Sequence, residues 1–221
     1  MLEVDHILVA LGRVPEIESL GLEAAEVEYD RKEGIRVNDN LRSSNPRIYA
    51  AGDCCLSLKF THMADASARI ALQNALFGGR RKVSSLNVPW CTYTDPEVAH
   101  VGMYEWEASE KGLDFETLSI PLKELDRALL DEDERGFLKV TYTKRRGKIL
   151  GATLVAGHAG EMISELSVAM KAGLPMGKLS GVIHPYPTQA EIFRKAGDLY
   201  NSRKLNPLTK KVLKAWMTLF N

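Results

Sequence analysis

The stretch Ile48-Tyr49-Ala50-Ala51-Gly52-Asp53 is the most informative part of this sequence. Arg47–Ala51 is typical of a short buried strand, which delivers a glycine and then an acid to its carboxyl end. In open α/β sheets, ligands bind in the crevice beyond that end. Glycine lets backbone approach a ligand closely, and the Asp53 carboxylate can accept a hydrogen bond from a sugar or ribityl hydroxyl. Taken alone, the two residues favour a simple Gly-Asp turn.

Apolar patterns on both sides of this stretch predict further elements. The continuous apolar run Ile7–Leu11, which ends at a glycine, is typical of a strand buried in a parallel sheet. A lone strand cannot satisfy its backbone or bury its faces, so we expect its sheet partners to be missing upstream. Ile35–Asn38 predicts another short strand. Ala64–Phe77 has helical spacing and is followed by two glycines that stop a helix.

The second half of the sequence predicts an antiparallel α+β domain that begins near residue 85. Gly136–Tyr142 and Ile149–Ala156 flank a basic, glycine-containing turn and predict a hairpin. Helical spacing follows over Glu161–Ala172, and a further helix is expected from about Thr188 to Tyr200. The fold class is therefore α/β followed by α+β.

Composition sets limits on location and partners. Lys plus Arg equals Asp plus Glu at 29 each, which argues against a nucleic-acid partner. No apolar run reaches about 18 residues, and the first residues lack the pattern of a signal peptide. The three cysteines, Cys54, Cys55 and Cys91, form neither a zinc pattern nor an even disulfide framework. We expect a cytoplasmic, folded chain.

The last segment, Asn206–Asn221, combines three lysines with apolar and aromatic residues and predicts a basic amphipathic helix. Such a helix more often docks on its own domain or on a dimer mate. Contact with an anionic membrane surface is the less favoured alternative.

In their order, the motifs resemble those of the pyridine nucleotide-disulfide oxidoreductase family of glutathione reductase, dihydrolipoamide dehydrogenase and mercuric reductase. The resemblance extends from about Val4 to Tyr200, and several weak motifs in one order are together a strong signal. It implies that residues 1–84 are the C-terminal portion of an FAD/NAD-linked Rossmann-like region and that residues 85–200 are a dimerisation domain. Residues 201–221 are then the basic amphipathic helix predicted from the sequence pattern. The motifs that carry it, besides the Gly-Asp pair, are Leu8–Pro15, Phe60–Ala66, Pro96–Gly102, Ile149–Ala152 and Gly160–Ile163.

The resemblance also implies cofactor contacts. Gly12 becomes the glycine near the nicotinamide dinucleotide of NAD(P)H, and Asp53 becomes the carboxylate that binds the ribityl chain of FAD. The backbone of a short segment faces the flavin, where N–H groups and the positive end of a helix dipole stabilise charge on reduced flavin. The residues of that segment are Lys59, Phe60, Thr61 and His62.

A second site is implied at His184–Glu191. In disulfide reductases of the family, a His-Pro-Thr-x-x-Glu motif supplies a base to the dithiol of the partner subunit, and the Glu orients the base. Glu191 matches that acid, but Tyr186 stands in place of the histidine and His184 lies two residues earlier. A tyrosine with a pKa near 10 is a poor general base at neutral pH compared with a histidine near 6.5. The tyrosine resembles the mercuric reductase branch, although this chain lacks that branch's C-terminal cysteine pair, and Cys54 and Cys55 are interpreted as small core residues.

Three parts that the family needs are absent from the sequence: two glycine-rich phosphate loops and a Cys-x-x-x-x-Cys disulfide. We therefore expect a homodimeric C-terminal portion of an FAD-dependent oxidoreductase that is inert alone and needs an upstream or separate FAD/NAD-binding half. The intact enzyme would pass electrons from NAD(P)H through FAD to a disulfide, a metal ion or another acceptor. The alternative is a stand-alone dimerisation or binding module without catalysis.

Overall fold

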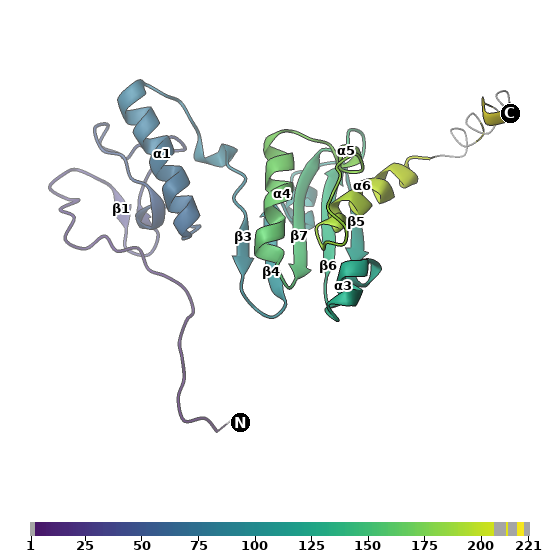
Figure 1. The fold of residues 1–221 in the computed structure, drawn as a ribbon. Helices are drawn as coiled ribbons and strands as arrows, with labels where there is room; N and C mark the ends of the chain where they lie inside the picture. The colour runs from purple at the N-terminus through teal and green to yellow at the C-terminus, as the bar shows by residue number, and fades with distance from the viewer. Residues whose placement is uncertain (1–2, 206–210, 212–215, 219–221) are drawn as a thin grey trace. The chain divides into compact units, whose positions relative to one another are not determined.

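A computed structural model describes residues 3–205, 211 and 216–218. The chain divides into two compact units, Met1–Leu86 and Asn87–Asn221, here called unit 1 and unit 2 (Figure 1). The functional division at residues 84 and 200 stays a prediction, because compactness assigns no role to a unit.

Unit 1 is built around one long helix and a set of irregular turns. Helix α1, Thr61–Phe77, ends at Gly78, which adopts a left-handed conformation that costs glycine little. This confirms the helix predicted over Ala64–Phe77. Around it lie the strands β1 (Tyr29–Asp30) and β2 (Gly34–Ile35) and the 3-10 turns η1 (Gly52–Cys54) and η2 (Val83–Ser85). A small core forms from Ile17, Leu22, Val27, Ile35 and Ala50.

The strand predicted at Ile7–Leu11 is not formed, which corrects the sequence-based expectation. In Figure 1 this N-terminal segment extends away from β1 and α1 without joining a sheet. Leu8 and Leu11 are 92% and 95% exposed. The physical reason is that a strand needs a neighbouring strand to pair its backbone, and unit 1 offers none along this segment.

The two other strands predicted in unit 1 are shorter than expected for the same reason. At Arg47–Ala51 the structure holds only an isolated bridge, between Tyr49 and Arg42. The Ile35–Asn38 strand reduces to the end of β2 and one bridge from Val37 to Ser43.

Unit 2 is a five-stranded antiparallel sheet with the order β3-β4-β7-β6-β5. The predicted hairpin is confirmed as β6 and β7, which pair from Phe137 opposite Val155 to Tyr142 opposite Ile149. The strands are β3 (Trp90–Thr92), β4 (Glu97–Gly102), β5 (Phe115–Pro121), β6 (Phe137–Thr143) and β7 (Ile149–Ala156).

Helices cover this sheet and close its core. The predicted Glu161–Ala172 helix is confirmed as α4, Ala159–Lys171, which packs against β4 and β7, and α6, Glu191–Arg203, packs against β5 (Figure 1). Leu154, Leu166 and Phe193 are fully buried between these layers. Burial of each such side chain stabilises the fold by about 1.5–3 kcal/mol. The shorter elements are α2 (Glu105–Glu110), η3 (Leu122–Glu124), α3 (Asp126–Leu130) and α5 (Met176–Leu179).

The basic helix predicted for residues 201–221 lies largely outside the described residues, which include Lys211 and residues 216–218 in helical conformation. Within the described part of the chain, no helix has the length and apolar character needed to cross a membrane.

Candidate functional site

The Gly52–Asp53 turn is fixed against α1 by close packing. Gly52 has a φ of +75°, and a Cβ atom there would lie 3.0 Å from the Cβ of Ala64. The Gly52 N–H also donates to Oγ of Ser67, 3.0 Å away. Glycine therefore lets the turn lie directly on the helix, and the next residue, Asp53, is exposed to solvent.

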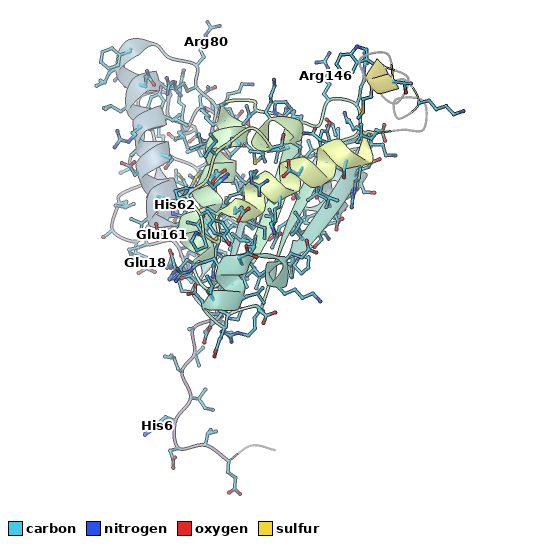
Figure 2. The ribbon with its side chains drawn as sticks, turned by 45° about the vertical axis from the view of Figure 1, so that its right-hand side comes forward. His6, Glu18, His62, Arg80, Arg146 and Glu161 are labelled. Carbon is cyan, nitrogen blue, oxygen red and sulfur yellow. The ribbon has the colours of Figure 1, made fainter. Side chains whose placement is uncertain are left out.

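The N-terminus of α1 presents its positive dipole end without a side-chain cap. Phe60 occupies the cap position with an extended backbone and makes no side-chain hydrogen bond there. The rings of Phe60 and His62 stack with centroids 5.2 Å apart. Figure 2 shows His62 in the first turn of α1, with Arg80 beyond the other end of the helix. The four orphan N–H groups of a helix start attract negative charge.

The segment around Gly12 meets the same helix start. The Arg13 guanidinium donates a hydrogen bond to the carbonyl of Lys59, whose own ammonium lies 3.1 Å from the carbonyl of Leu56. Gly12 has a φ of +136°, which side chains rarely adopt, and a Cβ atom there would meet no described atom within 4 Å. The structure thus brings the Gly12 region and residues 59–62 together.

Cys54 and Cys55 follow directly after Asp53, and both are half-buried free thiols. The Cys54 sulfur lies 3.3 Å from the carbonyl of Ala51, and the Cys55 sulfur lies 3.6 Å from that of Gly52. A hydrogen bond from Cys55 lowers the pKa of Cys54 to about 6, and the same bond together with burial raises the pKa of Cys55. Both side chains pack beside the small core of unit 1, as the sequence suggested.

In unit 2, His184 pairs with an acid that sequence reasoning missed. Nε2 of His184 lies 3.0 Å from Oε1 and 3.2 Å from Oε2 of Glu165. The His184 side chain is 6% exposed, and its Nδ1 is buried without a hydrogen-bond partner among the described residues. Glu165 lies on α4, 19 residues before the histidine, so no local spacing in the sequence could indicate the pair.

Tyr186 and Glu191 each have a different partner. The Tyr186 hydroxyl donates to Oδ2 of Asp126 at 2.8 Å, and the tyrosine is 71% exposed. The hydrogen bond to Asp126 raises the pKa of Tyr186, and the charges of Asp126 and Glu191 raise it further. Glu191 accepts a hydrogen bond from Arg194 instead of from His184.

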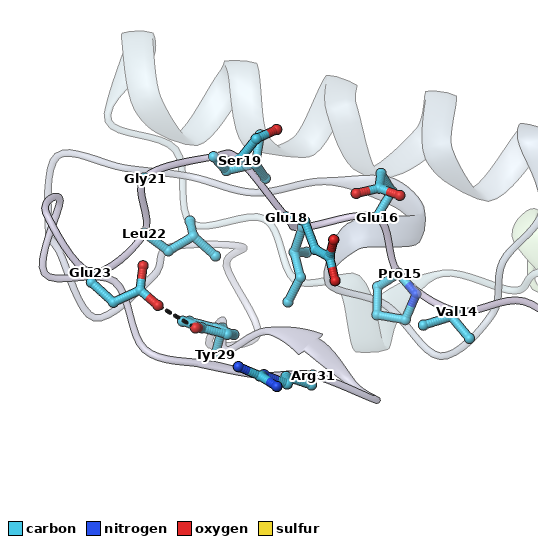
Figure 3. Close-up of a pocket in the computed structure, with 12 residues that line it drawn as sticks. Val14, Pro15, Glu16, Glu18, Ser19, Gly21, Leu22, Glu23, Tyr29 and Arg31 are labelled. Carbon is cyan, nitrogen blue, oxygen red and sulfur yellow. Dashed lines mark hydrogen bonds between the residues drawn. The ribbon is translucent and has the colours of Figure 1, made fainter.

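Two open cavities of similar size lie elsewhere. One of about 340 Å³ adjoins the loop before α6, and it is lined in part by Arg127, His158 and Gln189, whose Oε1 is buried without a partner among the described residues. The other, about 350 Å³, lies among the turns that follow Gly12 (Figure 3). Figure 3 shows the Tyr29 hydroxyl joined to the Glu23 carboxylate, a bond that lowers the pKa of Glu23.

Unit 1 holds a glycine–acid turn against the uncapped start of α1, and unit 2 is an antiparallel α+β unit. Comparison with known proteins gives the family. Residues 1–68 match the pyridine nucleotide-disulphide oxidoreductase family model, and residues 88–197 match the dimerisation domain of the same family. The chain belongs to the pyridine nucleotide-disulphide oxidoreductase family. This confirms the resemblance drawn from the motifs and the fold class expected from it.

Curated relatives include two kinds of enzyme. A mercuric reductase from Staphylococcus aureus is 38% identical over 191 residues, which cover 86% of this chain and 35% of that protein. A dihydrolipoyl dehydrogenase from Geobacillus stearothermophilus is 32% identical over 209 residues, which cover 95% of this chain and 44% of that protein. The chain therefore spans less than half the length of these relatives.

Solved structures of similar fold include the HOCl-induced flavoprotein disulfide reductase RclA from Escherichia coli, at 30% identity and a TM-score of 0.76. That match covers 87% of this chain and 44% of RclA. LpdA from Mycobacterium tuberculosis is similar at 29% identity and a TM-score of 0.81, over 88% of this chain and 42% of LpdA.

Proposed function

We propose that this chain is the C-terminal portion of an FAD-dependent NAD(P)H oxidoreductase and that it acts together with an upstream or separate FAD/NAD-binding half. In the assembled enzyme, FAD would supply electron transfer from NAD(P)H to a disulfide, a metal ion or another acceptor. The chain alone is inert, because the phosphate loops and the redox disulfide of the family are absent from its sequence. A cytoplasmic location remains part of this proposal.

The observation that carries the proposal is the placement of Asp53 beside the start of α1. The contact between Gly52 and Ala64 keeps the turn on the helix, and the Phe60 side chain leaves the helix start uncapped. An exposed carboxylate and a positive helix end fit a ligand that carries hydroxyl groups and gains negative charge. These residues therefore fit FAD, which supplies hydride acceptance when bound.

Each residue of this part of the site has a distinct task. Asp53 would accept a hydrogen bond from the ribityl chain of FAD, and the backbone of residues 59–62 would stabilise negative charge on the ring system. Gly12 leaves room for the nicotinamide side, because no described atom would meet even a Cβ placed there. The Arg13 bond to the Lys59 carbonyl ties this region to the flavin-facing segment.

Unit 2 contributes the dimer and the acid-base groups. The family match over residues 88–197 is to a dimerisation domain, and we propose a homodimer through this unit, with each active site built from both subunits. A tyrosine is protonated at neutral pH, and the hydrogen bond to Asp126 raises the pKa of Tyr186 further, so it would serve as a proton or hydrogen-bond donor toward the acceptor. Tyr186 is a poor general base, so His184, which pairs with Glu165, takes that role. Glu191 then acts as a nearby charge on Tyr186 rather than as the partner of the histidine.

The runner-up is a stand-alone dimerisation or binding module. The exposed apolar segment of residues 3–11 argues against it, because side chains such as Ile7 and Leu8, at 80% and 92% exposure, favour coverage by further strands. A module that worked by itself would gain nothing from such a segment.

The test is the intact mass and visible absorbance of the protein purified from its native source. A flavin band on a longer or a paired polypeptide, lost when Asp53 is changed to asparagine, is the expected result. A colourless dimer of this chain alone, unable to bind flavin with any co-purifying chain, would overturn the proposal and support the module.

A further inference from the structure

The turn between β6 and β7 gathers positive charge on the surface of unit 2. It contains Lys144, Arg145, Arg146 and Lys148, all of them exposed. The Lys144 ammonium lies 3.1 Å from a carboxylate oxygen of Asp114, which offsets one of these charges. Figure 2 shows Arg146 on the outer surface of the unit. The turn therefore presents cationic side chains to solvent.

The end of α6 lies against this turn and adds to its charge. Gly147 carries no side chain, and a Cβ atom there would lie 2.3 Å from the hydroxyl oxygen of Tyr200 on α6. The Lys204 ammonium lies 3.5 Å from the carbonyl oxygen of Arg145 and 4.7 Å from the centre of the Tyr200 ring. Arg203, one residue earlier, is also exposed. Packing of the turn on Tyr200 thus holds two basic segments side by side.

We call this surface the basic patch, and its members are Lys144, Arg145, Arg146, Lys148, Arg203 and Lys204. The patch is a local concentration of charge, because Lys plus Arg equals Asp plus Glu at 29 each over the whole chain. At physiological ionic strength its attraction reaches about 8 Å before salt screens it. An anionic partner must therefore come almost into contact with the patch.

The sequence after α6 indicates which kind of anionic partner fits. The match to the dimerisation domain ends at residue 197, so residues 198–221 lie beyond it. Lysines in this segment are interspersed with apolar and aromatic residues. In its described part, Trp216 and Met217 are each 58% exposed. Cations combined with apolar and aromatic side chains suit the boundary between lipid headgroups and acyl chains.

We propose that the basic patch binds the surface of a membrane rich in anionic phospholipid, with the segment after α6 as its apolar contact. A bilayer offers phosphate groups for the cations and a hydrocarbon layer for the apolar side chains. A nucleic acid offers phosphates without such a layer. Docking of the basic segment on this end of its own unit would bring its lysines against the cations of the patch, and like charges repel.

The experiment measures sedimentation of the 221-residue chain with sucrose-loaded vesicles. One set of vesicles contains equal parts of phosphatidylglycerol and phosphatidylcholine, and the other contains phosphatidylcholine only. The chain should bind the first set and not the second. The bound fraction should fall as the sodium chloride concentration rises, because salt screens the attraction.

The double variant Arg145→Gln with Arg146→Gln tests the patch itself. Each Lys or Arg near an anionic bilayer raises affinity about fivefold, so this variant should bind about 10-fold or more weakly. Arg80→Gln with Arg81→Gln is the matched control, since it removes the same charge from two adjacent, exposed arginines of unit 1. The control should bind as the native chain does.

Tryptic footprinting of the unmutated protein keeps the test valid if a variant fails to fold. Anionic vesicles should slow cleavage after Arg145 and Arg146, and not after Arg80 and Arg81. Absence of binding, equal binding to both vesicle sets, or equal weakening by the two double variants would overturn the proposal. Release from the vesicles by duplex DNA at equal phosphate concentration would also overturn it, in favour of a nucleic acid. Flavin enters none of these steps, so the proposed oxidoreductase function can stand or fall separately.

Discussion

Nε2 of His184 lies 3.0 Å from Oε1 of Glu165, and this pair joins the loop before α6 to the middle of α4. The histidine side chain is 6% exposed, so water cannot readily replace the carboxylate. Removing one partner of a buried hydrogen bond costs more than the bond itself contributes.

Glu165→Ala should therefore lower the free energy of unfolding by about 1–3 kcal/mol, because it leaves His184 buried without either ring partner. Glu165→Gln keeps an acceptor oxygen and should cost less. Urea denaturation measures both. Ser164→Ala, at the exposed neighbouring position of α4, is the matched control and should stay within about 0.5 kcal/mol. Equal losses for all three variants would show that the pair contributes nothing.

His100 makes stability depend on pH. Its ring is 3% exposed, stacks on Tyr104 and bonds to Thr153 and to the carbonyl of Gly102. Burial lowers its pKa below the ordinary value of 6.5, so the folded state binds fewer protons than the unfolded state. The contribution of this group is complete above about pH 6.5 and is lost as the pH falls from there through the lowered pKa.

The check for His100 is a series of urea midpoints between neutral and mildly acidic pH. The native protein should lose stability across this range, and His100→Gln should show a shallower loss. Ser164→Ala, at an exposed position of α4 that carries no titratable group, is the control and should leave the slope as it is. Parallel slopes for the native protein and His100→Gln would contradict the prediction.

Tyr186→Phe removes the hydroxyl that donates to Asp126 and keeps the ring. Because the side chain is 71% exposed, unfolding should be unchanged, whereas turnover in the flavin-loaded assembly should fall about 100-fold if the hydroxyl supplies a proton. Steady-state kinetics with NAD(P)H and the natural acceptor measure this. Tyr93→Phe, at another exposed tyrosine, should have no effect on turnover. Full turnover by Tyr186→Phe would remove this residue from the mechanism.

Gly52→Ala tests how tightly the Asp53 turn is held on α1. Gly78 provides a control with the same kind of backbone, since its φ is +62° and a Cβ there would meet nothing within 4 Å. Gly78→Ala should cost about 1–2 kcal/mol from its left-handed conformation alone. Gly52→Ala should cost more, because its Cβ also presses on Ala64. Thermal or urea unfolding measures the loss of stability in both variants. An equal loss would contradict the prediction, because it would mean that the structure around Ala64 shifts to accept the added Cβ without cost.

How much could be predicted depended on whether the signal was local. The helix over Ala64–Phe77 and the β6–β7 hairpin follow from periodicity and turn residues that lie within one stretch of chain, so both were predicted. The strand at Ile7–Leu11 was predicted from apolar content alone, but a strand forms only beside a partner, and no strand in the described part of unit 1 pairs with this segment. Short bridges replaced the predicted strands around Val37 and Tyr49 for the same reason.

The same contrast between local and long-range signals decided which residues of the candidate site could be predicted. The motif order placed Asp53 and residues 59–62 near one helix start, where the Gly52 packing holds the turn. It did not reveal Glu165 or Asp126, because these acids reach His184 and Tyr186 across 19 and 60 residues of sequence. Such pairings are set by tertiary packing, and no spacing rule contains them.

The uncovered backbone of residues 3–11 has a practical consequence for anyone who handles this chain. Its backbone amide and carbonyl groups can form hydrogen bonds with the same segment of a second molecule, so concentrated samples can aggregate into fibrous precipitates. Unit 1 loses no buried side chain if a protease trims the segment, since every residue from 3 to 14 is exposed. Clipped and unclipped material can therefore look equally well folded while differing in how long they stay in solution.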